Sequence, residues 1–197
     1  MALLHRLMEL LDTLDPPAIP EAILRAFLDA LGLSTAWMAW IEDDPGERFS
    51  LVAAVGLPPE LEAEGRASLR GSPCRCQRMA LRVEGSEATL WIGCERLESL
   101  GLQATHLTIP LRFRGHTYGV MNFLIPPDFR LEEDARQSLT LAGRLCGAIL
   151  GHLRAMDRLQ RQYGRLQDLS RIAQLANQPL PLRELLSRIT AEMVTML

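Results

Sequence analysis

The stretch from Thr105 to Pro127 constrains the fold most, because it consists of two strand-like runs joined by a tight glycine turn, Arg114-Gly115-His116. In the first run, apolar Leu107, Ile109 and Leu111 alternate with His106, Thr108 and Pro110. Successive side chains of a strand point to opposite faces, so this alternation predicts a sheet with one buried face. We therefore expect an antiparallel hairpin here.

A second strand pair is predicted earlier in the chain. The apolar runs "STAWMAWIE" and "FSLVAAVG" flank the turn sequence "DDPGER", which indicates another hairpin. An amphipathic helix from about Glu21 to Leu31, ended by Gly32, precedes it, and a short helix in "LPPELEAEG" follows it. A leucine-rich helix is expected within 1–17, where the prolines of "DPPAIP" stop it.

The helical period returns at about Leu131 and continues until "NQPLP". Apolar and amphipathic residues follow it at steps of four and three, which is the spacing of a two-helix seam; they are Leu145, Ile149, His152, Met156, Leu159, Tyr163 and Leu166. A helix this long extends beyond a small domain, so we expect it to pair with a second copy of the chain. The alternative is two consecutive helices with a kink near Gly164.

The overall composition argues against several classes of protein. Twenty-one basic and twenty-four acidic residues give a net charge of −3, so no basic surface indicates nucleic-acid binding. The N-terminus carries charged residues and no cleavage site typical of a signal peptide, and no stretch is apolar enough to span a membrane. We expect a cytoplasmic protein, in which cysteines are normally reduced.

Three of the four cysteines lie within residues 71–97, at Cys74, Cys76 and Cys94. Two cysteines separated by one residue direct their thiols to one point only where the backbone is irregular, and Pro73 makes such a start plausible. Nearby arginines favour the thiolate form. The fourth, Cys146, lies in the apolar run "LAGRLCGAIL" and is interpreted as a core residue.

The region from about residue 20 to 150 resembles a GAF domain. In that family a strand ending in Ile-Pro-Leu is followed by a glycine turn, a Gly-Val-x-Asn strand and a final helix. The matching positions are Gly119, Val120 and Asn122 in the strand, Phe129, Glu133 and Asp134 before the helix, and Ala142, Ala148 and Ile149 on its apolar face.

The resemblance implies an α+β fold, with an antiparallel sheet, helices packed on one face and a long C-terminal signalling helix. It implies four segments: an N-terminal helix (1–17), a sensory domain (18–150), a coiled-coil linker (151–178) and the start of a further sensory or output unit (179–197). Such modules stand upstream of two-component histidine kinases, so the chain itself is expected to be non-enzymatic. The residues typical of bilin and cyclic-nucleotide binding are missing here.

In the GAF arrangement the three loop cysteines would lie at the mouth of the ligand pocket, where they resemble a pattern of redox- or gas-responsive kinase modules. They are one ligand short of a closed zinc site or an iron–sulfur cluster. The fourth ligand is left open between Cys146, His106, His116 and a cysteine of a partner chain. Trp37, Trp40 and Trp91 are candidate pocket walls, although Trp37 and Trp40 should face opposite sides of a strand.

Two other functions stay open. One branch of the GAF fold reduces free methionine sulfoxide with three cysteines, and Cys76 lies roughly where that branch has one of them. However, the segment "ERLESLGLQ" lacks the thiol that this branch carries after the strand. The other alternative is a ligand-free dimerisation module.

Overall fold

The computed structural model describes residues 15–42, 48–82 and 87–177, together with single positions before and after these ranges. The chain divides into two compact units, Met1–Gly151 and His152–Leu197, which are described separately. The turn expected in "DDPGER" and most of the segments 1–17 and 179–197 lie outside the described residues. No helix in the described part is long and apolar enough to cross a membrane.

A five-stranded antiparallel sheet forms the centre of the first unit, in the order β2-β1-β5-β4-β3. Its strands are β1 (Ala36–Ile41), β2 (Phe49–Val55), β3 (Thr89–Ile92), β4 (Thr105–Phe113) and β5 (His116–Ile125). Both expected hairpins are present as the pairs β1–β2 and β4–β5. His116, which the sequence placed in the turn, begins β5 instead, because its backbone already pairs with Phe113.

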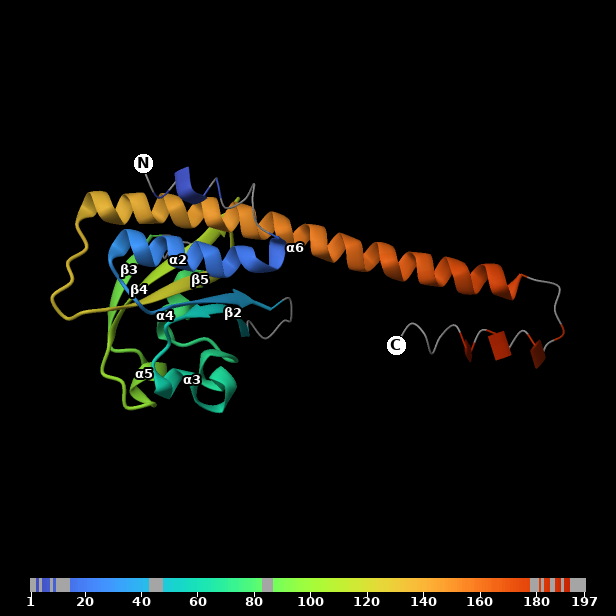
Figure 1. Cartoon of the computed structure of the whole chain (residues 1–197), viewed down its shortest axis with the longest axis horizontal. Helices are drawn as coiled ribbons and strands as arrows, with labels where there is room; N and C mark the ends of the chain where they lie inside the picture. Colours follow the sequence, from blue (N-terminus) through green and yellow to red (C-terminus); the bar gives the residue numbers. More distant parts are fainter. Residues whose placement is uncertain are drawn as a thin grey trace. The chain divides into compact units, whose positions relative to one another are not determined.

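Two helices, α2 (Ile19–Leu31) and the part of α6 (Glu133–Ala176) up to Gly151, cover one face of the sheet (Figure 1). The 3₁₀ turn Pro16–Ala18 leads into α2, so this helix begins two residues before the predicted start. It ends at Gly32, whose φ of 65° is accessible to glycine at little cost. Phe27 of α2 packs on Phe123 of β5 with 5.7 Å between ring centroids.

Glycines let α6 lie very close to the sheet. A Cβ atom on Gly147 would stand 2.6 Å from the backbone nitrogen of Arg112, and one on Gly143 would stand 2.9 Å from the carbonyl oxygen of Pro110. Side chains larger than hydrogen are therefore excluded at both positions. The helix is continuous through Gly164, so the alternative of two helices is wrong.

Three short helices lie on the opposite face of the sheet (Figure 1). They are α3 (Pro59–Arg66), α4 (Arg75–Leu81) and α5 (Glu95–Glu98), with a 3₁₀ turn at Ala67–Leu69. The buried side chains on this side include Trp37, Leu61, Leu69 and Leu97. The α+β fold with an antiparallel sheet and a long C-terminal helix is thus confirmed. The expectation of helices on one face only is wrong, because helices cover both faces and β4 is buried on both sides.

Within the part of α6 that follows Gly151, several large apolar side chains are exposed. They are Met156, Leu159, Tyr163, Leu166 and Leu169. The first four lie at alternating steps of three and four residues, as the seam prediction requires. Their pairing with a partner helix stays a prediction.

Candidate functional site

Cys74 and Cys76 lie where an extended segment turns into α4. Cys74 is the N-cap residue, with an extended backbone (φ −74°, ψ 173°), and Cys76 belongs to the first turn of the helix. The change from extended to helical backbone is what turns the two side chains toward one point.

Gln77 fixes the start of α4. Its Oε1 accepts a 3.0 Å hydrogen bond from the backbone N–H of Cys74 and lies 3.3 Å from the Cys74 Sγ, which can also donate to it. The Gln77 backbone N–H in turn donates to the Cys74 sulfur, so the two residues form a capping box. The buried Gln77 side chain therefore holds Cys74 in place.

Cys94 comes from a later segment of the chain, and its sulfur lies near those of Cys74 and Cys76. It follows β3 and Gly93, whose φ is 72°, and it is the N-cap of α5. Its extended backbone (φ −132°, ψ 123°) directs the side chain back toward α4. The short helix α5 was not predicted, although "ERLE" after a strand could have indicated it.

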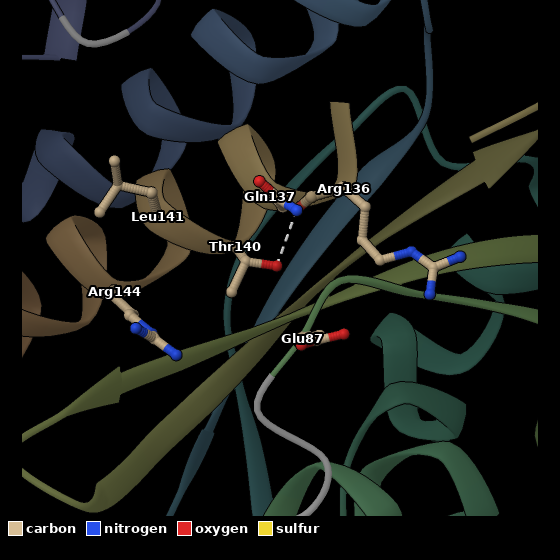
Figure 2. A pocket seen from close by; sticks show the side chains of 6 residues that line it. All are labelled: Glu87, Arg136, Gln137, Thr140, Leu141 and Arg144. Carbon is tan, nitrogen blue, oxygen red and sulfur yellow. Dashed lines mark hydrogen bonds between the residues drawn. The ribbon is translucent and has the colours of Figure 1, made fainter. Parts of the chain in front are cut away.

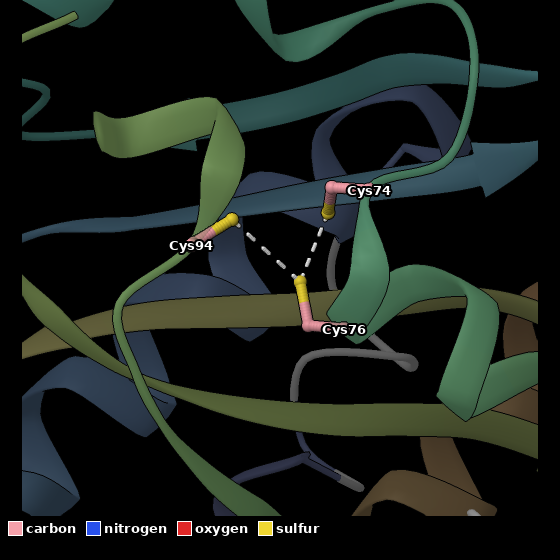
Figure 3. A group of neighbouring side chains, drawn as sticks. All are labelled: Cys74, Cys76 and Cys94. Carbon is pink, nitrogen blue, oxygen red and sulfur yellow. Dashed lines mark hydrogen bonds between the residues drawn. The ribbon is translucent and has the colours of Figure 1, made fainter. Parts of the chain in front are cut away.

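The three sulfur atoms form a compact group (Figure 3). The Sγ atoms of Cys74 and Cys76 are 2.9 Å apart, and those of Cys76 and Cys94 are 4.0 Å apart. All three sulfurs lie within 4.8 Å of one another, and each residue is at most 6% exposed. Zn–S bonds of about 2.3 Å place tetrahedral ligands about 3.8 Å apart. The distance between Cys76 and Cys94 is close to this value, whereas that between Cys74 and Cys76 is shorter.

The three thiols differ in their pKa values. Hydrogen bonds from Cys74 and Cys76 lower the pKa of Cys94, helped by the backbone N–H groups of Arg96 and Leu97. The neighbouring sulfurs and burial raise the pKa of Cys76. The pKa of Cys74 is also raised: the bond with Cys76 lowers it, but the bond with Cys94 and burial outweigh that effect. Of the three thiols, Cys94 is therefore the one that loses its proton most readily.

Polar contacts tie the two cysteine-bearing segments together. Glu95 Oε1 accepts hydrogen bonds from the backbone N–H of Arg75 (2.8 Å) and from the Arg78 guanidinium (3.0 Å). Arg96 donates to the carbonyl oxygen of Ser72 at 2.6 Å. These contacts hold Cys94 next to Cys74 and Cys76.

The floor of the site is the sheet itself. His106 of β4 is 1% exposed and stacks on Trp37 of β1, with ring centroids 6.4 Å apart. Trp37 belongs to the same buried cluster as the three cysteines. Beside them, Thr108 donates a buried 2.8 Å hydrogen bond to Asn122 on the neighbouring strand.

The other predicted site residues lie in different places. Cys146 is fully buried in α6, on the opposite face of the sheet from α4 and α5, and burial raises the pKa of its thiol to about 12. His116 is exposed beside the β4–β5 turn. Trp37 is a wall of the site, while the side chain of Trp91 lies outside the described residues.

A hollow lies beside the N-terminal half of α6 (Figure 2). Its cavity volume is about 290 Å³, and Glu87, Arg136, Gln137, Thr140, Leu141 and Arg144 line it. The Thr140 hydroxyl is already engaged, because it accepts from the Ala88 N–H and donates to the Arg136 carbonyl. This hollow lacks the convergent, buried groups that characterise the cysteine site.

Two comparisons of the sequence with known proteins found no match. No family model matches the sequence. No curated protein matches it either.

Solved GAF domains are similar in structure. One, from an Acinetobacter phosphoenolpyruvate-protein phosphotransferase, is 15% identical with a TM-score of 0.57, over 80% of this chain and 96% of the other. Another, assigned to a sensor histidine kinase of Pseudomonas syringae pv. tomato, is 16% identical with a TM-score of 0.59, over 81% and 90%. A third, from a Coxiella burnetii phosphotransferase, is 15% identical with a TM-score of 0.59, over 80% and 95%. The chain therefore has the fold of a GAF domain.

Proposed function

We propose that this chain is the sensory module of a signal-transduction protein and that Cys74, Cys76 and Cys94 bind a metal centre, either a zinc ion or an iron–sulfur cluster. The observation that carries the proposal is the meeting of three buried sulfur atoms within 4.8 Å of one another. Buried cysteines are common in cores, but three thiols from two separate segments that meet at one point are the arrangement that a metal centre requires.

The electrostatics of the group support a cation. The pKa of Cys94 is lowered, whereas hydrogen bonds among the sulfurs, burial and the charge of the neighbouring sulfur raise the pKa values of Cys76 and Cys74. A divalent ion supplies the missing positive charge, so that all three sulfurs bind as thiolates and release their protons. The polar contacts of Gln77 and Glu95 keep the cysteine segments in place for it.

The sensory role rests on the fold. A GAF domain from a sensor histidine kinase shares this architecture, and a GAF domain of a two-component kinase is the module that the sequence resembles. We infer that a change in redox state or metal occupancy shifts α4 and α5, and that the sheet passes this change to α6. An output unit further along the same protein would receive the signal; the present chain needs no catalytic activity of its own.

A second copy of the chain is the proposed partner of α6. Met156, Leu159, Tyr163 and Leu166, here called the exposed seam, present an apolar face to solvent. The positions that flank the seam are uncharged; they are Ala155, Gln160, Gln162 and Gln167. Two identical helices can therefore pair in parallel without repulsion between like charges.

Sedimentation of the full chain tests this dimer. Leu159→Glu places a charge in the exposed seam and should convert the dimer to a monomer. Arg165→Glu introduces the same side chain outside the seam and should leave the dimer intact. A wild-type monomer at concentrations of about 0.1 mM or higher would refute the pairing.

Anaerobic purification tests the metal centre. Iron, zinc and sulfide are measured in the wild-type chain, in Cys74→Ser/Cys76→Ser and in the control Cys146→Ala. We expect a stoichiometric metal in the wild type and the control, and its loss in the double variant. Sulfide together with visible absorbance distinguishes a cluster from zinc.

The result against the proposal is a folded wild-type chain without metal. The remaining functions would then be a thiol switch, a reductase of free methionine sulfoxide or a ligand-free module. Adding methionine sulfoxide and measuring the loss of thiols distinguishes the reductase. The low exposure of all three cysteines, at most 6%, argues against that enzyme.

A further inference from the structure

Among the described residues, His106 is a buried polar side chain without a hydrogen-bond partner. The residue is 1% exposed, and within the described residues neither Nδ1 nor Nε2 has a hydrogen-bond partner. A neutral imidazole has one donor and one acceptor, and leaving such a group unpaired in the interior destabilises the fold. An imidazole kept in this position therefore indicates that a bound group uses it.

The surroundings of His106 point to the cysteine site. The ring stacks on Trp37, at 28° between planes, and Trp37 packs in the same buried cluster as Cys74, Cys76 and Cys94. On β5 the register partner of His106 is Leu124, which packs against the same buried cluster, so His106 lies on the face of the sheet that the cysteine segments cover. His106 comes from β4, whereas the cysteines come from the segments that cover this face.

The chemistry of the sulfur group calls for one more ligand. Three thiolates and a divalent ion carry a net charge of −1, and a tetrahedral ion still has one position to fill. A neutral imidazole fills it without adding charge to a buried site, and three cysteines with one histidine form a known ligand set for zinc. The other candidates are less suitable, because Cys146 lies across the sheet and His116 is exposed.

We propose that His106 supplies the fourth, nitrogen ligand of the metal centre bound by Cys74, Cys76 and Cys94. This assignment rests on the proposed function. His106 is not one of the side chains whose ligand atoms lie within 4.8 Å of one another, so ligation requires a rotation of its side chain or a small movement of the cysteine segments toward β4. Metal binding would thereby pull the covering helices onto the sheet.

X-ray absorption at the edge of the metal that the purified chain carries tests the assignment. The wild type should show scattering from an imidazole ring as well as from sulfur. His106→Leu should lose the imidazole scattering and bind the metal at least tenfold more weakly. His106→Cys should keep the metal with an additional sulfur in place of the nitrogen. His116→Leu is the matched control and should be indistinguishable from the wild type.

Thermal unfolding adds a readout that a purely structural histidine would not produce. Without metal, His106→Leu should be at least as stable as the wild type, because it removes two unpaired polar atoms. With metal, the same variant should lose the stabilisation that the wild type gains. Metal therefore reverses which of the two chains, His106→Leu or the wild type, is the more stable.

Three results would overturn the assignment. Imidazole scattering that persists in His106→Leu excludes this residue, and so does a wild-type centre with sulfur ligands but no imidazole. In both cases the cysteine site itself stands. A wild-type chain that holds no metal overturns both the assignment and the proposed function.

Discussion

The carboxylate of Glu95 accepts a 2.8 Å hydrogen bond from the backbone N–H of Arg75, and this contact joins the first residues of α5 and α4. The same oxygen also accepts a bond from Arg78. A cysteine is the N-cap of each helix, Cys74 for α4 and Cys94 for α5. Glu95 therefore sets the distance between Cys94 and the pair Cys74 and Cys76.

Glu95→Ala should weaken metal binding without changing the ligands. Residues that orient metal ligands typically contribute about 10- to 100-fold to affinity, and for this solvent-exposed contact we expect about tenfold. Competition with a chromophoric chelator measures the change. Glu60→Ala in α3 removes an exposed carboxylate away from the site and should have no effect. Equal affinities in the two variants would show that Glu95 does not organise the site.

Replacing Cys146 should reveal its ionisation in the unfolded chain. Burial raises the pKa of the folded thiol to about 12, whereas an unfolded thiol titrates near its ordinary pKa of 9.0. Because the folded pKa is the higher one, its contribution to stability is complete below pH 9.0 and is lost as the pH rises toward 12. Relative to Cys146→Ala, the metal-free wild type should lose about 1.4 kcal/mol for each pH unit above 9. Urea unfolding of both chains at about pH 8, 9 and 10 checks this. A difference in free energy of unfolding that does not change with pH would contradict it.

The Thr108–Asn122 pair should show strong coupling. Thr108→Val or Asn122→Leu alone leaves one buried partner unpaired, which costs about 1–3 kcal/mol. The double variant removes both polar groups and should be less destabilised than the sum of the two single variants. Denaturant unfolding of all four chains gives the coupling free energy. Additive effects would indicate that the bond contributes nothing.

Gly147→Ala should destabilise the domain although alanine favours helices. The new Cβ would meet the Arg112 backbone, which cannot move aside as a flexible side chain would, so we expect a loss of about 1–3 kcal/mol. Gly164→Ala is the matched control in the same helix, where nothing lies within 4 Å of the added atom. It should be stabilising by up to about 1 kcal/mol. If both variants behave alike, close packing of α6 on the sheet is not the reason for Gly147.

Much of the fold could be predicted from the sequence because its local signals agree. The alternation around Ile109 predicted β4, and Gly32 predicted the end of α2. The glycine turn fixed the β4–β5 hairpin to within a residue. These features depend on neighbours in the sequence, where periodicity and turn chemistry are informative.

The site was only partly predictable for the opposite reason. The Cys-x-Cys spacing indicated a site, but the contact of Glu95 with Arg75 joins two segments whose relative placement no local pattern encodes. The alternation placed His106 on a strand, whereas its unpaired nitrogens are evident only once the sheet and its covering helices are assembled. The stacking of His106 on Trp37 likewise depends on strand order.

The central claim is that Cys74, Cys76 and Cys94 bind one metal centre, and native mass spectrometry of the anaerobically purified chain tests it most directly. The account predicts a mass increase of one zinc ion or one iron–sulfur cluster per chain, with protons displaced from the thiols, and no increase in Cys74→Ser/Cys76→Ser. A folded wild-type chain at the mass of the bare polypeptide would contradict it.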